Sequence, residues 1–146
     1  MTLGAFTGYF RERQSLKNIT HPYDDYKAHI VLGVIYDTVS DIDERKSYTL
    51  EQLGEIVSVI KNFQFFVQEK WQIAIDRPGS GNTKNIGSVS KIEDLVNGNG
   101  TFAELGEDVF NDYWMYYLTA DMAKKAELPK PYYSNLAEYK QFKHMD

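Results

Sequence analysis

Helix start signals constrain this sequence more than any other feature. Three S/T-x-x-E/Q segments, beginning at Thr49, Ser90 and Thr101, have the form of a capping box. In a capping box two side chains satisfy backbone N–H groups at the start of a helix. A chain with three such signals and few runs of alternating polar and apolar residues is predicted to be mainly α.

Apolar residues three and four positions apart extend this pattern. The segment 23–45 carries a stripe in which Tyr26 and Ile30 begin a series of four-residue steps, and 49–75 carries a second stripe. Residues at this spacing share one face of a helix. Both segments are therefore predicted to be amphipathic helices with one buried face.

The predicted architecture is a compact bundle of about five or six helices. The chain has 146 residues, which fits a single helical domain over 1–146. Its central pair would be the helices 49–75 and 101–126. Trp71, Ile73 and Ile75 alternate with Gln72 and Ala74, which is strand periodicity, so a minor β element near 71–75 is left open.

One long glycine-rich loop interrupts the predicted helices. Residues 77–88 are rich in Gly, Asn and Ser, which favour turns and loops. The letters GSGNT, residues 79–83, resemble the phosphate turn of flavodoxins, but the spacing of a Walker A motif is absent. We expect an exposed loop that tolerates substitution, and whether it binds an anion is left open.

Charge argues against general nucleic-acid binding. The net charge is −5, and no Lys or Arg occurs between Ile92 and Met122. Phosphate backbones are bound mainly by Lys and Arg. The acidic stretch either solvates helix faces or meets a basic protein partner, whereas 56–92 is the most positive stretch of the chain. We therefore expect a protein partner or a homo-oligomer, with no general nucleic-acid binding and no membrane contact.

Five successive large residues, 113–117, form the most aromatic run of the sequence. Such a run covers every side of a helix, so it lies either in a core or in an oligomer contact. Core burial and an interface are equally favoured by the sequence. The residues of the predicted interface are Tyr113, Trp114, Tyr116 and Tyr117.

Carboxylates one helical turn apart supply an alternative, enzymatic interpretation. Facing helices that carry paired carboxylates can hold hard cations such as Mg²⁺. The pieces EQLGE and ELGED resemble short elements of the MazG-like nucleotide pyrophosphohydrolases, a resemblance that implies an Mg²⁺-dependent activity. Carboxylates in the first turn of a helix also interact favourably with the helix dipole. This interaction explains the positions of these acidic residues without a metal. The candidate metal ligands of this alternative are Glu51, Glu55, Glu104, Glu107 and Asp108.

The favoured function is that of a non-catalytic helical protein that binds a protein partner or self-assembles. Its composition is similar in style to small structural or assembly proteins of tailed phages, and an acidic inhibitor is a further form of the same hypothesis. The chain lacks cysteine and has no apolar run of membrane-spanning length, so we expect a cytoplasmic location in the producing or host cell. We expect no cofactor and no catalytic residue, and lean against an enzyme.

Overall fold

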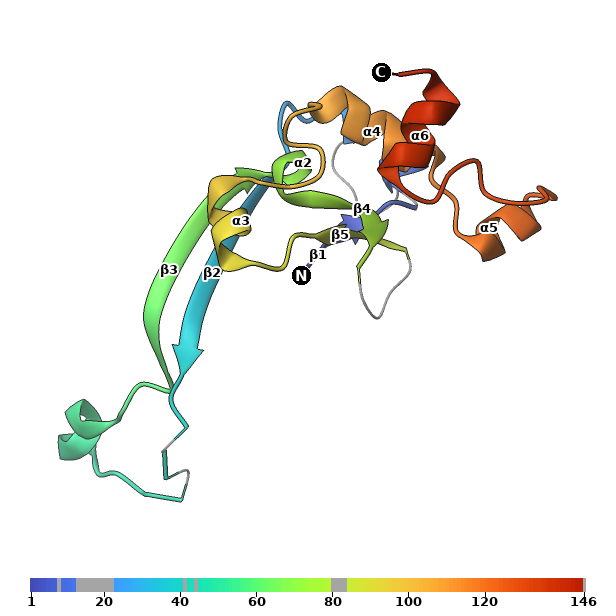
Figure 1. The fold of residues 1–146 in the computed structure, drawn as a ribbon. Helices are drawn as coiled ribbons and strands as arrows, with labels where there is room; N and C mark the ends of the chain where they lie inside the picture. The colour runs from blue at the N-terminus through green and yellow to red at the C-terminus, as the bar shows by residue number, and fades with distance from the viewer. Residues whose placement is uncertain (8, 13–22, 41, 44, 80–83, 146) are drawn as a thin grey trace. The chain divides into compact units, whose positions relative to one another are not determined.

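The computed structural model describes residues 1–7, 9–12, 23–40, 42–43, 45–79 and 84–145 (Figure 1). Contacts divide the chain into two compact units. Unit 1 comprises Met1–Val31 and Gln68–Asp146, and unit 2 comprises Leu32–Val67. The expectation of one domain over 1–146 concerns independent folding and stays a prediction.

The prediction of a mainly α bundle is wrong, because the described residues form a mixed α/β structure with two antiparallel sheets. One sheet has the strand order β1-β5-β4, and the other pairs β2 with β3. The helices of unit 1 are short and surround its sheet. The strands are β1 Thr2–Ala5, β2 Ile30–Thr38, β3 Ile60–Glu69, β4 Ala74–Pro78 and β5 Asn85–Ser88.

The helical elements are brief. No α-helix in the described ranges exceeds 10 residues, the length of α4. Short helices of this kind depend on tertiary packing for their stability. They are α1 Tyr9–Glu12, η1 Tyr23–Asp25, η2 Leu50–Glu55, α2 Lys70–Ile73, α3 Ile92–Asn97, α4 Glu107–Tyr116, α5 Ala120–Lys125 and α6 Leu136–Lys143.

The predicted helices 23–45 and 49–75 are replaced largely by β2 and β3. Residues four apart share a face in a strand as well as in a helix, because four is a multiple of the strand period of two. β2 is rich in Ile, Val, Tyr and Thr, which favour strands. Gly33 of β2 lies directly against the Phe66 ring of β3, where an added Cβ would come within 1.9 Å of Cε1. This close approach fixes the pairing of the two strands.

The structure confirms some of the three predicted helix starts and not others. The capping box at Thr49 is present, but it opens the 3₁₀ helix η2 and not a long helix. A short helix, α3, does follow Ser90 and ends at Gly98 with a φ of 70°, but its N-cap is Lys91 and no side chain caps it, so the capping box predicted at Ser90 is not formed. Thr101 begins a turn, so the predicted helix 101–126 is divided into α4 and α5. The minor β element near 71–75 is confirmed in part, since β4 begins at Ala74.

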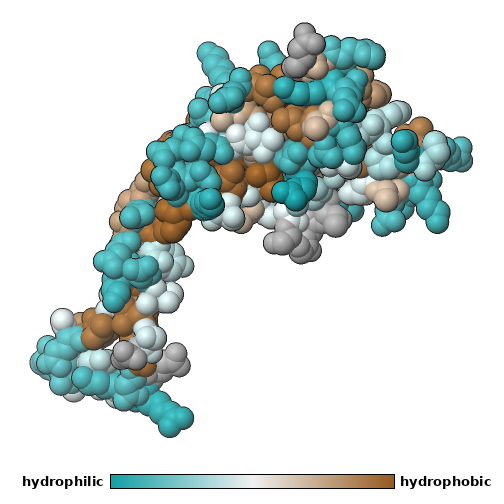
Figure 2. Space-filling view, in the orientation of Figure 1, coloured by the Kyte–Doolittle hydropathy of each residue, from teal (hydrophilic) through white to brown (hydrophobic). Residues whose placement is uncertain are grey.

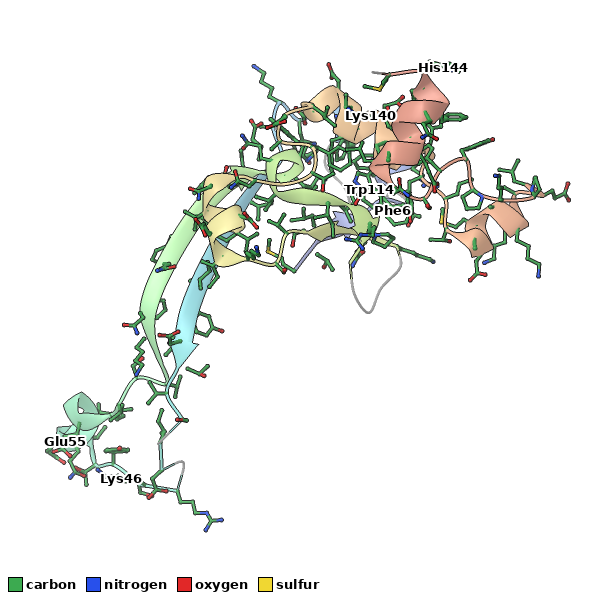
Figure 3. The ribbon with its side chains drawn as sticks, viewed as in Figure 1. Phe6, Lys46, Glu55, Trp114, Lys140 and His144 are labelled. Carbon is green, nitrogen blue, oxygen red and sulfur yellow. The ribbon has the colours of Figure 1, made fainter. Side chains whose placement is uncertain are left out.

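Aromatic side chains dominate the core of unit 1. Phe6 and Trp114 lie side by side, with ring centroids 5.0 Å apart (Figure 3). The Tyr133 hydroxyl donates to the Tyr113 carbonyl at 2.6 Å, which joins the segment before α6 to α4. The fully buried rings are those of Phe6, Phe10, Phe102, Phe110, Tyr113, Trp114 and Tyr133.

In the described part of the chain, no helix combines the length and the apolar character that a membrane crossing requires.

Candidate functional site

The β4–β5 hairpin carries the glycine-rich loop. Pro78 lies opposite Ile86 in antiparallel register. The Gly79 N–H donates to the Asn85 carbonyl at 2.9 Å, at the loop end of the hairpin. Strand structure therefore extends into both ends of the segment that was predicted to be loop.

The loop proper runs over 79–84, and its residues 80–83 lie outside the described part of the chain. At its last residue, the Lys84 carbonyl accepts a hydrogen bond from the Phe6 N–H at 2.8 Å. This bond attaches the end of the loop to the segment that follows β1. The loop thus leaves the sheet from two fixed points.

Asp76 anchors the β4 side of the hairpin to the helical layer. Its backbone carbonyl accepts a hydrogen bond from the Tyr113 hydroxyl of α4 at 2.6 Å. Its carboxylate accepts the Leu136 N–H, at the first residue of α6, at 2.9 Å. Because both partners belong to packed helices, these hydrogen bonds hold the β4 side of the hairpin in place.

A glycine permits the close strand packing behind this loop. A Cβ on Gly87 would lie 2.5 Å from the Arg77 carbonyl oxygen and 2.9 Å from the Ile75 Cδ1 atom. Real Cβ atoms do not approach backbone oxygens this closely. Gly87 is therefore required by space, since its backbone is not in the left-handed region.

Gly87→Ala is expected to lower the free energy of unfolding by about 1–3 kcal/mol, because the added methyl group forces β4 and β5 apart. Gly54→Ala is the matched control: nothing lies within 4 Å of its added Cβ, so stability should hold. Urea denaturation of both variants measures the difference. Equal stability of Gly87→Ala and the parent chain would contradict the packing argument.

Arg77 and Lys84 are exposed cations at the two sides of the loop, whereas Lys91 lies beyond the opposite end of the β4–β5 hairpin. The Arg77 side chain is 74% exposed, and its Nε lies 3.8 Å from the Asp76 carboxylate, which leaves it largely in solvent. Lys84 and Lys91 are also exposed. These three side chains belong to the stretch 56–92 that the sequence marks as most positive, and two of them, Arg77 and Lys84, lie where the chain enters and leaves the loop.

Lys70 is a largely buried cation of unit 1 that lies among aromatic rings. Its Nζ lies 4.8 Å from the Tyr23 ring centroid, 5.4 Å from that of Phe10 and 5.9 Å from that of Phe110. Burial lowers the pKa of Lys70 to about 8, and the nearby Glu107 carboxylate opposes this effect. The aromatic rings attract the charged form, so they too limit the fall.

Lys70 is expected to make stability rise with pH between about 8 and 10.5, its folded and ordinary pKa values. In that window the unfolded lysine binds a proton that the folded one lacks, so the slope is positive and at most about 1.4 kcal/mol per pH unit. Urea denaturation of the parent chain and of Lys70→Met across this window isolates the contribution. Identical pH profiles of the two proteins would contradict it.

The sequence-predicted carboxylates fall in both units. Glu51 and Glu55 are exposed in η2 of unit 2, and Glu55 lies in the connection between β2 and β3 (Figure 3). Glu104 and Asp108 are exposed in unit 1, and Glu107 begins α4 half-buried. Burial raises the pKa of Glu107, as do the Glu69 and Asp108 charges. Among the described residues, no group of three or more His, Asp or Glu is placed to hold a metal ion.

The aromatic run divides between core and surface. Tyr113 and Trp114 are fully buried and Tyr117 is almost so, whereas Tyr116 is 52% exposed. The neighbouring carbonyls of Trp114 and Tyr117 accept hydrogen bonds from the Arg11 guanidinium. Of the four predicted interface residues, only Tyr116 is thus placed to contact a partner.

Comparison with known proteins relates the chain to one family of restriction endonucleases. The family model described as restriction endonuclease EcoRV matches residues 1–144. The chain is 39% identical over 141 residues to the Type II restriction enzyme EcoRV of Escherichia coli, a match that covers 95% of the chain and 54% of that enzyme. The chain therefore spans about half the length of the curated relative it matches.

These matches overturn three expectations. A nuclease family replaces both the non-catalytic helical partner-binding protein and the MazG-like pyrophosphohydrolase. It also replaces the description of an all-α, phage-like interaction protein. Restriction endonucleases cut DNA, so the expected absence of nucleic-acid contact does not hold for this family. The negative net charge led to the wrong expectation about nucleic-acid binding, because net charge sums over the whole chain. Contacts with DNA depend instead on where the cationic side chains lie.

Sequence reasoning located the glycine-rich loop but interpreted it as a plain solvated segment. The positive stretch 56–92, noted for its charge alone, contains Arg77, Lys84 and Lys91. Combining these observations would have marked the loop as a candidate contact with a polyanion. The hydrogen bonds of Asp76 were beyond sequence reasoning, because Tyr113 and Leu136 are remote in the chain.

Proposed function

Because the chain belongs to the EcoRV restriction endonuclease family, we propose that it binds double-stranded DNA as part of a type II restriction endonuclease, with the 79–84 loop at the contact. The observation that carries this proposal is the anchoring of the β4–β5 hairpin by Asp76. A loop that reads DNA must be held in a fixed position, because base edges are discriminated by hydrogen-bond geometry.

The loop chemistry suits such a role. Its letters GSGNTK offer hydroxyl, amide and ammonium groups on small or flexible side chains. Asn and Ser or Thr side chains hydrogen-bond base edges, and Lys bonds guanine or phosphate. Arg77 and Lys84 stand at the two sides of the loop, where they would meet the phosphate backbone.

The proposal for this chain is DNA binding, and no cleavage step is assigned to its residues. Nucleases commonly use bound divalent cations to stabilise the attacking and leaving oxygens. The described residues do not fit such an ion, because they bring together no group of three His, Asp or Glu. Cleavage is proposed only for an enzyme that also contains a counterpart of the rest of the Escherichia coli enzyme, beyond the 54% that this chain matches. A cytoplasmic location, where bacterial DNA is found, is part of the same proposal.

Fluorescence anisotropy with a labelled duplex library of random sequence tests the proposal. Binding is expected in a metal-free buffer, and log K should fall linearly with log salt by about 0.9 per phosphate contact. Selection of bound duplexes then reveals any preferred sequence. No binding even at low ionic strength, or equal binding of single strands and duplexes, would refute the proposal.

A further inference from the structure

The β4 strand is bulged just before the loop. Ala74 lies opposite Ser88, and Pro78 lies opposite Ile86. β4 thus takes four residue steps where β5 takes two, so its residues 75–77 are displaced from regular pairing. Such bulges bend the strand that carries them and are over-represented next to active sites, where they redirect a side chain or the chain itself. The bulge at 75–77 therefore sets the direction in which β4 continues toward the loop.

Asp76, the middle residue of this bulge, is held by two helices. The Tyr113 hydroxyl of α4 donates to its backbone carbonyl at 2.6 Å, and its carboxylate accepts the Leu136 N–H of α6 at 2.9 Å. In Figure 1, β4 lies below these two helices. Of the two contacts, only the Tyr113 hydrogen bond acts on the backbone of the bulge itself.

The Tyr113 side chain is fixed in the core so that its hydroxyl is presented at one place. It is fully buried, and its ring centroid lies 5.0 Å from that of Tyr133 and 5.3 Å from that of Tyr139. Hydrophilic residues, drawn in teal, form much of the outer edge of unit 1 (Figure 2), as expected where the large rings lie inside. Burial raises the pKa of Tyr113, and the Asp76 charge adds to the effect. The hydroxyl therefore keeps its proton and stays a donor at physiological pH.

The other end of the loop depends on the same helix. The Phe6 N–H donates to the Lys84 carbonyl at 2.8 Å. The Phe6 ring packs on that of Trp114, the residue after Tyr113 in α4, with centroids 5.0 Å apart. α4 thus supports both points at which the chain enters and leaves the 79–84 loop.

We propose that Tyr113 is a positioning residue for DNA sequence recognition: its hydroxyl holds the bulge at Asp76 and so fixes the direction in which β4 enters the loop. The proposal rests on the DNA contact assigned to the 79–84 loop. Tyr113 is buried, so it acts on DNA only through Asp76 and Gly79. Discrimination between base pairs depends on hydrogen-bond geometry in the groove, whereas phosphate contacts carry no sequence information directly.

Loss of the Tyr113 hydroxyl is expected to reduce specificity more than affinity. The Asp76 carbonyl then loses its partner in α4, and the bulge is free to shift relative to that helix. The exposed cations Arg77 and Lys84 remain, so the attraction to phosphates and its salt dependence persist. A displaced loop would meet base edges with poorer hydrogen-bond geometry. The expected signature is weaker sequence discrimination at an unchanged salt slope.

Tyr113→Phe tests the proposal, with Tyr133→Phe as the matched control. Each change removes one buried hydroxyl that donates to a carbonyl at 2.6 Å, Tyr113 to Asp76 and Tyr133 to Tyr113. Only the first change removes a contact with β4. The ratio of affinities for a selected duplex and a random duplex should fall about tenfold in Tyr113→Phe, because base contacts lose their geometry. The ratio should hold in Tyr133→Phe, and the slope of log K against log salt should be the same in both variants.

Hydrogen exchange without DNA gives an independent measurement. The Gly79 N–H is bonded to the Asn85 carbonyl at the loop end of the hairpin. By NMR, its exchange should be about tenfold faster in Tyr113→Phe than in Tyr133→Phe, because local opening becomes easier when the bulge is released. If Tyr113→Phe does not fold, Asp76→Ala takes its place, since it removes the α6 contact of the same bulge and leaves the buried rings intact.

Two results would overturn the proposal. One is equal exchange of the Gly79 amide in the two tyrosine variants, which would mean that Tyr113 does not hold the hairpin. The other is sequence discrimination that survives Tyr113→Phe or falls equally in Tyr133→Phe, since the hydroxyl would then serve the core alone. A parent chain that binds no duplex would refute the DNA proposal and with it the recognition role. Faster Gly79 exchange in Tyr113→Phe would then still show that the hydroxyl holds the hairpin.

Discussion

Trp114→Ala is expected to lower the free energy of unfolding of unit 1 by about 3–5 kcal/mol, the usual effect of removing a buried large aromatic side chain. The indole is fully buried and packs against the rings of Phe6, Tyr113 and Tyr117. Its removal leaves a cavity that the surrounding rings of Phe6, Tyr113 and Tyr117 do not fill. Thermal and urea unfolding followed by circular dichroism measure the loss.

Two further variants give this prediction its controls. Tyr116→Ala removes the exposed neighbour in the same helix and should change stability little. Trp114→Phe should be much milder than alanine, because the buried indole N–H finds no hydrogen-bond partner among the described atoms. Phenylalanine thus fills most of the site and removes a polar group that is unsatisfied. A stable, folded Trp114→Ala protein that only loses self-association would instead support an interface role.

Arg77→Ala combined with Lys84→Ala is expected to weaken duplex DNA binding about 10–100-fold at moderate salt, as phosphate contacts contribute most of such affinity. If each side chain neutralises one phosphate, the slope of log K against log salt should decrease by about 1.8. Anisotropy titrations at several salt concentrations give both quantities. Circular dichroism should be unchanged, because both side chains are exposed.

The matched control removes the same charges elsewhere. Arg45→Ala with Lys46→Ala deletes one arginine and one lysine from exposed positions in unit 2. A loss of affinity through net charge alone would be equal in both double variants. A loss through contacts at the 79–84 loop would be confined to Arg77 and Lys84. Equal weakening by the two pairs would argue against the loop as the contact.

Much of the candidate site was visible in the sequence, although its meaning was not. Gly and Asn between the two apolar runs predicted the loop, and the positive stretch 56–92 contained its cations. The importance of Gly87 could not be predicted, because its reason is the Arg77 carbonyl on the opposing strand. The role of Asp76 was equally hidden, since its partners belong to α4 and α6.

Features that depend on sequence neighbours were determined by the sequence alone. Gly98 ends α3 in the left-handed region, and the Asn135 side chain caps α6 by accepting the Glu138 N–H at 3.0 Å. The capping box at Thr49 forms through contacts within four residues. Because such hydrogen bonds join residues close in the sequence, their residue types can predict them, although the signals at Ser90 and Thr101 form no capping box.

Tertiary structure alone decided between helix and strand for the apolar stripes. A four-residue spacing is compatible with both the helix period and the strand period. The apolar stripe in 30–38 therefore could not by itself distinguish a helix from a strand. The partner that makes it a strand is Phe66, which closes over Gly33 from another strand 33 residues further along the chain. The burial of Trp114 against Phe6 was decided in the same way, by residues from opposite ends of the sequence. Contacts of this kind add favourable energy only after the chain has folded back on itself, and no local pattern records them.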